Sequence, residues 1–172
     1  VSLAQTGEVL SIVNRSGNRP SHEGAAAEVD RAMGVCFDGG FRRILLRGDT
    51  DFSQTKHLDR WTDDARVQFV FGLDCTGNRR FLADELPQMR WSPLVGPPRY
   101  DVETEPRTRP ENVKERIVRE REFNNIRLRS EDVAEMPYRP TACRKTYRMI
   151  VVRKNLTVEK GELRLFDDYR YF

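Results

Sequence analysis

Cysteine and histidine are scarce in this 172-residue sequence, and neither is placed for disulfide or zinc chemistry. The three cysteines, Cys36, Cys75 and Cys143, lie far apart, which excludes a complete disulfide framework and matches no zinc-site spacing. His22 and His57 are isolated, and neither has a metal-ligand partner four residues further on. We therefore expect small buried thiols in a reducing cytoplasm.

Long apolar runs and a leader are also missing. No run approaches the roughly 20 apolar residues that span a bilayer, and the N-terminus has no basic segment followed by an apolar one. Hydrophobic residues make up 38% and charged residues 33% of the chain, so the composition predicts a soluble globular protein and no membrane partner. The length allows one domain with a core, or a core with an extension.

Both ends of the sequence resemble the interior of a longer chain. The sequence begins Val-Ser-Leu-Ala, without Met and already in strand-like text, and it ends Asp-Tyr-Arg-Tyr-Phe without a polar tail. We therefore expect a fragment of a larger protein.

The first part of the chain predicts a hairpin followed by a helix. Two short apolar segments, residues 1–4 and 9–13, flank a turn that contains glycine, which is typical of a β-hairpin. Apolar residues then recur at helical spacing over residues 25–37, with Ser21 as a good N-cap. Gly39-Gly40 then ends the helix, because glycine readily adopts the left-handed backbone conformation found after the last helical turn.

Strands and helices continue to alternate up to residue 83. Residues 43–48 contain Ile44-Leu45-Leu46, apolar on successive positions, which predicts a strand buried on both faces in a mixed or parallel sheet. A short helix capped by Ser53 should follow, and residues 67–73 predict another strand. Right-handed crossovers would place the helices on the sheet. We therefore expect an α/β core over residues 1–83.

The composition of the sequence changes after residue 83. Residues 84–111 form a connector in which prolines prevent a long helix, namely Pro87, Pro93, Pro97, Pro98, Pro106 and Pro110. Residues 112–172 predict a β-rich insertion with strands at 147–152 and 163–166. For residues 112–123 a helix is the competing prediction, because Val113, Ile117 and Val118 also fit one helical face.

Asp49 is the strongest candidate for a catalytic or metal-binding residue. It stands where the expected buried strand ends, and ligands of α/β sheets bind at the carboxyl ends of the strands. A carboxylate there is a hard oxygen ligand that suits Mg²⁺ or Mn²⁺. The alternative is that Asp49 or Asp51 only caps the next turn, which is a common role for aspartate after a strand.

Several motifs resemble one protein family. Residues 14–25 read Asn-Arg-Ser-Gly-Asn-Arg-Pro-Ser-His-Glu-Gly-Ala, and residues 46–52 read Leu-Arg-Gly-Asp-Thr-Asp-Phe. Together they resemble the group 1 DDE transposases of bacterial insertion sequences, and the later segments 110–116 and 138–142 resemble the same family. The resemblance covers essentially the whole chain, and two long motifs in this order make it specific.

The resemblance implies a fold and a catalytic role. Members of this family have an RNase H-like core, with a β-strand insertion between the second and third of three catalytic carboxylates. Asp49 matches the second carboxylate, whereas the position of Asp51 is often small in relatives and is not expected to be a ligand. The first Asp is expected upstream of Val1 and the Glu downstream of Phe172. The chain would then be a partial RNase H-like core followed by a β-rich insertion.

The implied activity is metal-assisted phosphoryl transfer at the ends of a transposon. Two Mg²⁺ or Mn²⁺ ions, held roughly 3.5–4 Å apart by the three carboxylates, activate the attacking oxygen and stabilise the leaving one. The implied partner is double-stranded DNA, both transposon ends and target, and the full-length family proteins generally act as homodimers. Two alternatives remain open: another RNase H-like nuclease, and a non-catalytic DNA-binding remnant of a transposase.

Basic residues give independent but ambiguous support for a DNA partner. The net charge of +3 is too small to indicate a partner, but residues 139–154 contain no acid and six basic side chains, namely Arg139, Arg144, Lys145, Arg148, Arg153 and Lys154. Such clusters neutralise phosphates, and they also occur as solvated residues that guard a sheet edge. Arg15 and Arg19 lie in a Gly/Asn/Ser loop that could grip a phosphate or could be an ordinary surface loop.

Overall fold

The chain folds into two units that each combine helices and strands. The computed structural model describes residues 1–14, 16–20, 22–96, 130–161, 163 and 165–172. The first unit comprises Val1–Asp74 and Tyr138–Tyr147, and the second comprises Cys75–Pro137 and Arg148–Phe172. The predicted α/β class is confirmed, with one two-stranded and one four-stranded sheet. Arg15, Ser21, most of the expected connector and the first part of the expected insertion lie outside the described residues.

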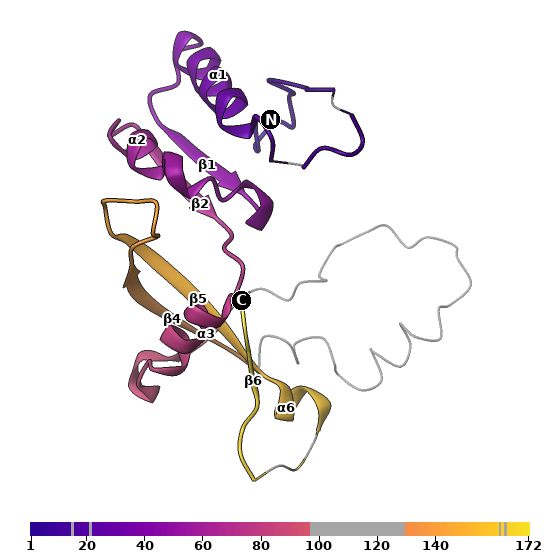
Figure 1. The fold of residues 1–172 in the computed structure, drawn as a ribbon, viewed down its shortest axis with the longest axis vertical. Helices are drawn as coiled ribbons and strands as arrows, with labels where there is room; N and C mark the ends of the chain where they lie inside the picture. The colour runs from indigo at the N-terminus through magenta and orange to yellow at the C-terminus, as the bar shows by residue number, and fades with distance from the viewer. Residues whose placement is uncertain (15, 21, 97–129, 162, 164) are drawn as a thin grey trace, which may run out of the picture. The chain divides into compact units, whose positions relative to one another are not determined.

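Helix α1 spans Ala25–Asp38 in the first unit (Figure 1), close to the predicted limits. It ends in a Schellman motif, in which the Gly40 N–H donates to Phe37 O (3.0 Å) and the Phe41 N–H donates to Cys36 O (3.0 Å). Gly40 has φ 90°, a left-handed conformation that favours glycine. The predicted Gly39-Gly40 stop is therefore confirmed.

Strands β1 (Ile44–Gly48) and β2 (Val67–Phe71) pair in parallel, in a register that sets Ile44 opposite Val67 and Gly48 opposite Phe71. Both strands were predicted from their apolar runs. Full burial of β1 was wrong, because alternate residues are exposed and Leu45 keeps 62% of its surface. The apolar run therefore marks one packed face and one open face within the described part of the first unit.

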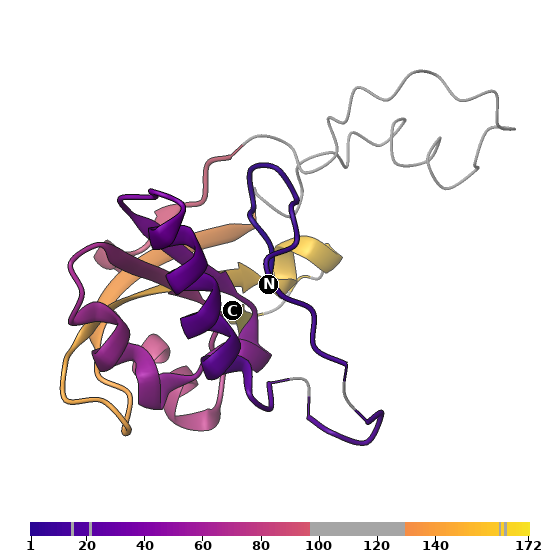
Figure 2. The same cartoon turned by 90° about the horizontal axis from the view of Figure 1, so that it is seen from above.

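The packed face of the β1–β2 pair carries the core of the first unit. Leu46, Phe69 and Phe71 lie on this face and pack with Leu58 and Trp61, which belong to the short helix α2 (Leu58–Thr62). The apolar side of α1 joins the same cluster, through Ala26, Val29, Met33 and Phe37. Figures 1 and 2 show both helices beside the strand pair. A crossover helix between two parallel strands is the expected way to cover such a face.

Polar contacts join the two helices. Arg60 on α2 forms a two-pronged hydrogen bond with the Asp30 carboxylate of α1, at 3.0 and 2.9 Å. The indole N–H of Trp61 donates to the same carboxylate at 2.8 Å. Asp30 therefore satisfies the polar edge of a buried aromatic ring and fixes the spacing of α1 and α2.

The N-terminal segment forms less of a hairpin than its sequence predicts. Ser2 and Val9 make a single antiparallel bridge, and the Gly7 N–H closes the turn on Leu3 O at 2.8 Å. Gly7 has φ 74°, so the turn is where the sequence placed it. No regular strand extends from the bridge in the described residues of this segment.

The second unit is built on a four-stranded sheet of order β3-β4-β5-β6. Its strands are β3 (Ser92–Pro93), β4 (Glu131–Tyr138), β5 (Tyr147–Asn155) and β6 (Tyr169–Tyr171). Strand β5 was predicted, whereas the strand expected at 163–166 is absent from the described residues there. Leu165 and Phe166 keep 96% and 84% of their surface, because no neighbouring strand receives them. The strand forms a few residues later, as β6.

Helices α3 (Gly77–Asp84) and α6 (Leu156–Lys160) complete the second unit, with the short 3₁₀ turn η3 (Gln88–Arg90) before β3. Ala83 of α3 packs with Trp91, Ala134, Val151 and Tyr171 to form the core. Two further 3₁₀ turns, η1 (Thr50–Phe52) and η2 (Thr55–His57), lie in the first unit between β1 and α2. Among the helices described, none combines the length and apolarity needed to cross a membrane.

Arg153 is a charged residue inside the core of the second unit. Its guanidinium lies between the rings of Trp91 and Tyr169, 4.3 and 4.4 Å from their centres. It donates to the Asp132 carboxylate at 3.0 Å and to the Gln88 side chain at 2.9 Å. Only 5% of Arg153 is exposed, so its charge is compensated by these partners rather than by water.

This packing predicts that Arg153→Ala destabilises the second unit. Removal of the guanidinium leaves Asp132 without its ion pair and opens the space between the two rings, at a cost of about 3 kcal/mol. Urea denaturation of the whole chain measures the loss. Arg148→Ala is the matched control, since it removes the same charge from the same strand in an ion pair with Glu135 that is largely exposed. Equal stability of both variants would contradict a structural role for Arg153.

Candidate functional site

Asp49 directly follows β1 and begins the next turn. Its backbone is extended (φ −80°, ψ −169°), and its carboxylate accepts the Asp51 N–H at 3.2 Å, so it is the N-cap of η1. The Ser53 hydroxyl closes the turn on Thr50 O at 2.8 Å. The capping role that the sequence left open is therefore observed. It does not exclude a second role, because Asp49 is exposed and the cap uses only one of its several lone pairs.

The chemistry of Asp49 fits a hard divalent cation as one ligand. A carboxylate at the carboxyl end of a parallel strand is exposed to solvent and offers oxygen donors. Across the described ranges, no three or more His, Cys, Asp or Glu side chains gather so that they could hold a metal. Asp49 would therefore need ligands from outside the described residues to form a two-metal site.

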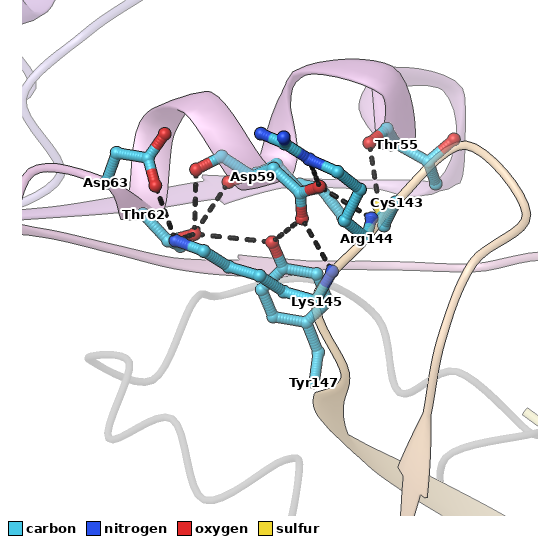
Figure 3. Close-up of polar contacts among 9 residues, drawn as sticks. Thr55, Asp59, Thr62, Asp63, Cys143, Arg144, Lys145 and Tyr147 are labelled. Carbon is cyan, nitrogen blue, oxygen red and sulfur yellow. Dashed lines mark hydrogen bonds and ion pairs between the residues drawn. The ribbon is translucent and has the colours of Figure 1, made fainter.

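A second polar cluster surrounds Asp59 in the first unit (Figure 3). Asp59 lies in the first turn of α2 and accepts three hydrogen bonds from one segment: the Arg144 N–H at 2.6 Å, the Lys145 N–H at 3.3 Å and the Tyr147 hydroxyl at 2.6 Å. The Cys143 thiol of this segment donates to Thr55 O at 3.1 Å. One carboxylate thus holds the backbone of residues 143–147 on α2.

Two of the predicted DNA-contacting residues, Arg144 and Lys145, lie in this clamped segment. The Lys145 ammonium is paired with Asp63 at 2.7 Å, so its charge is partly neutralised within the protein. The Arg144 side chain is 91% exposed and approaches Asp59 only at 3.9 Å. Arg139, earlier in the same segment, is also exposed. The clamp therefore fixes the backbone of the segment while the Arg144 guanidinium remains open to solvent.

The remaining basic residues of the stretch belong to the second unit and have acidic partners. Arg148 pairs with Glu135 and is exposed. Arg153 and Lys154 are buried, with only 5% and 7% of their surface accessible, and pair with Asp132 and Glu159. We assign Arg153 and Lys154 a structural role in place of the expected DNA contact, because a buried, paired cation has no free face for a phosphate.

The N-terminal loop contributes one described candidate. Arg19 pairs with Glu23 four residues on, at 2.9 Å, and its side chain is 59% exposed. An exposed pair of this kind is weak and can exchange its carboxylate for a phosphate. Arg15, the other basic residue of the loop, lies outside the described residues.

The polar contacts shift the acid–base behaviour of the Asp59 cluster. The Tyr147 hydroxyl and the two backbone N–H groups lower the pKa of Asp59, because each stabilises the carboxylate. Burial, followed by the hydrogen bond to Asp59, raises the pKa of Tyr147 to about 12. Burial also raises the pKa of the Cys143 thiol, with a smaller contribution from the Asp59 charge. The cluster therefore contains a neutral phenol bonded to the Asp59 carboxylate and a neutral thiol bonded to the Thr55 carbonyl oxygen.

Sequence reasoning missed Asp59, although a signal was present. Asp59 and Asp63 are four residues apart, so a helix places both on one side, where they meet the segment that contains Arg144 and Lys145. That acidic pair could have indicated a partner for a basic segment, but the partner lies 85 residues away in the sequence.

Comparison with protein-family models, curated proteins and solved structures finds no match to this chain.

The Asp59 cluster predicts a late titration of Tyr147. Its pKa of about 12 exceeds the roughly 10 of free tyrosine, so the stability it contributes is complete below pH about 10 and is lost as the pH rises towards 12. We expect ¹³C NMR of the Tyr147 ring to show this midpoint. Asp59→Asn should lower it part of the way, since burial remains.

Asp63→Asn is the control for that titration. It removes a neighbouring carboxylate that contacts Lys145 and not Tyr147, so the Tyr147 midpoint should stay where it is. An equal shift in both variants would mean that general charge, rather than the hydrogen bond, sets the pKa of Tyr147.

Proposed function

We propose that this chain is the central part of a DDE-type DNA transposase of a bacterial insertion sequence, with Asp49 as the second of three metal-binding carboxylates. The observation that carries the proposal is the position of Asp49: an exposed carboxylate that directly follows a parallel strand, at the sheet edge where α/β proteins bind ligands. The motifs at residues 14–25 and 46–52 support the family assignment.

The order of elements supports an RNase H-like core for the first unit. A turn with an antiparallel bridge is followed by α1, β1, α2 and β2, with β1 and β2 parallel and both helices on the packed face. In the proposed enzyme further strands and the other two carboxylates come from chain segments before Val1 and after Phe172. Strands β4, β5 and β6 of the second unit would belong to the β-rich insertion, whereas β3 lies in the segment predicted as a connector.

The chemistry proposed for the site is phosphoryl transfer on double-stranded DNA. Bound Mg²⁺ or Mn²⁺ ions would supply an activated oxygen nucleophile and stabilise the leaving oxygen. Asp49 would hold such an ion through its exposed oxygen, while its bond to the Asp51 N–H keeps the carboxylate in one orientation. Asp51 would only shape the turn.

DNA contact in the first unit is proposed for the segment that Asp59 clamps. Arg144 is an exposed basic residue in it, Arg139 is exposed shortly before it, and the backbone N–H groups of residues 144 and 145 are already satisfied by Asp59. A guanidinium on a fixed backbone can approach a phosphate with little loss of conformational freedom. Arg19 would add a weaker contact.

Asp49→Asn should abolish transposition in the full-length protein. Loss of one ligand removes metal positioning and charge stabilisation, and removal of even one electrostatic donor costs about 10²–10³ in rate. Asn keeps the size and can still cap η1, so binding to transposon ends should persist. Asp51→Gly should leave most of the activity. The measurement is a transposition assay with end binding followed in parallel.

The two variants separate the candidate functions. Near-normal transposition by Asp49→Asn would refute the catalytic role of this residue. A parent protein that binds DNA but neither cleaves nor transfers it, with or without Asp49, would favour the non-catalytic DNA-binding alternative. Loss of activity in Asp51→Gly with intact DNA binding would indicate that Asp51, rather than Asp49, is the metal ligand.

Arg144→Ala should weaken DNA binding in a salt-dependent way. If its guanidinium neutralises a phosphate, the slope of log affinity against log salt should become shallower by about one unit. Fluorescence anisotropy with duplex DNA over a salt series measures the slope. Arg31→Ala is the control, because Arg31 is an exposed arginine of the same unit, paired with Glu28 on α1. Equal slopes in the two variants would contradict a phosphate contact by Arg144.

A further inference from the structure

Gly72 lies against the turn that carries Asp49. It follows β2, and its N–H donates to Gly48 O at 3.1 Å, which extends the β1–β2 pairing one step beyond Phe71. A Cβ atom at Gly72 would stand 3.0 Å from both the nitrogen and Cγ2 of Thr50, and 3.2 Å from the carbonyl carbon of Asp49. Two of these three atoms are backbone, so rotation of a side chain cannot relieve the contact.

Gly48 is packed as closely on the other side of the turn. A Cβ atom there would lie 2.9 and 3.0 Å from the Phe71 ring and 3.0 Å from Cβ of Phe52. The Phe71 ring is itself held between neighbours, stacked on Phe69 at 5.5 Å and tilted against Trp61 at 5.9 Å. The backbone on both sides of Asp49 therefore lies close to the end of β2, without room for a further side chain at position 48 or 72.

The two glycines are needed for space and not for an unusual backbone. Neither is among the positive-φ glycines of the described residues, so an alanine could adopt the same dihedral angles. What alanine could not do is occupy the volume already taken by Thr50 and Asp49. The constraint is thus a close approach of two chain segments, which is one of the two physical reasons for glycine at a fixed position.

We infer that Gly72 is a positioning residue for Asp49. The absence of a side chain at position 72 lets the backbone of Asp49 and Thr50 rest directly on the end of β2, and that contact sets the direction of the Asp49 carboxylate. The link from this direction to metal binding rests on the proposed function, whereas the link from Gly72 to the backbone of the turn does not. Ligands must be held within about 0.5 Å of a productive geometry, so a small displacement should matter.

The test compares Gly72→Ala with Gly34→Ala in the whole chain. Gly34 lies in α1 of the same unit, and a Cβ atom there would meet nothing within 4 Å beyond its own helix, so its substitution should be silent at the turn. In ¹⁵N NMR spectra we expect Gly72→Ala to shift the amide signals of Asp49, Thr50 and Asp51 and to leave those of α1 in place. Adding Thr50→Ser to Gly72→Ala removes one of the three close contacts, so this double variant should fold more readily and its shifted signals should move part of the way back.

A second readout follows Mn²⁺, which broadens NMR signals near its binding site. Wild type should show broadening at Asp49 that Asp49→Asn removes, and Gly72→Ala should need a higher Mn²⁺ concentration for the same broadening. In the full-length parent, Gly72→Ala should lower transposition roughly 10²-fold, the cost of about 1 Å of misplacement, with end binding retained.

The outcomes separate the inference from the proposed function. Unchanged Asp49 and Asp51 amides in Gly72→Ala would overturn the positioning role, and so would shifts of these amides that the added Thr50→Ser leaves in full. Shifted amides with an unchanged Mn²⁺ response would overturn the link to the carboxylate direction. If neither this chain nor the full-length parent shows Mn²⁺ broadening that depends on Asp49, the metal-binding role proposed for Asp49 is contradicted, and the amide shifts still decide whether Gly72 positions the turn.

Discussion

The first unit depends on the parallel pairing of β1 with β2 and on the fact that only one face of this pair is packed. Two parallel strands cannot be joined by a tight turn, so the chain must cross over, and the crossover contains η1, η2 and α2. Because α2 returns over the packed face, Leu58 and Trp61 meet Leu46, Phe69 and Phe71. The same pairing brings Gly72 beside the turn at Asp49. Both the core and the candidate site therefore depend on the pairing of β1 with β2.

Much of the first unit could be predicted because its determinants are local. The helix stop at Gly39-Gly40 and the apolar runs of β1 and β2 act within a few residues, and each appears where the sequence indicated. Burial of β1 on both faces could not be judged in this way. An apolar run indicates which side chains can be buried. Whether one or both faces of the strand are covered depends on elements far away in the chain.

The second unit was less predictable because its stability depends on pairing across the sequence. Strand β4 contains three acidic residues and Pro137 and has no clear alternation, and it is a strand because β3 and β5 flank it. The sequence of residues 163–166 alternates well, but Leu163, Leu165 and Phe166 are exposed and pair with no strand in the described part of the chain. The basic stretch 139–154 contains no acidic residue in its own sequence. In the folded structure, however, Glu135, Asp132 and Glu159 from outside the stretch form ion pairs with three of its basic side chains.

The segment Tyr138–Tyr147 belongs to the first unit although the residues on either side of it belong to the second. Cys143 and Tyr147 supply part of the core around Leu58 and Val67, and the bond from Tyr147 to Asp59 spans 88 positions. During synthesis on the ribosome, residues 1–74 would therefore emerge with a gap in their core. That core closes only after residue 147 has left the exit tunnel, so the first unit completes its folding after residues 75–137 have been synthesised.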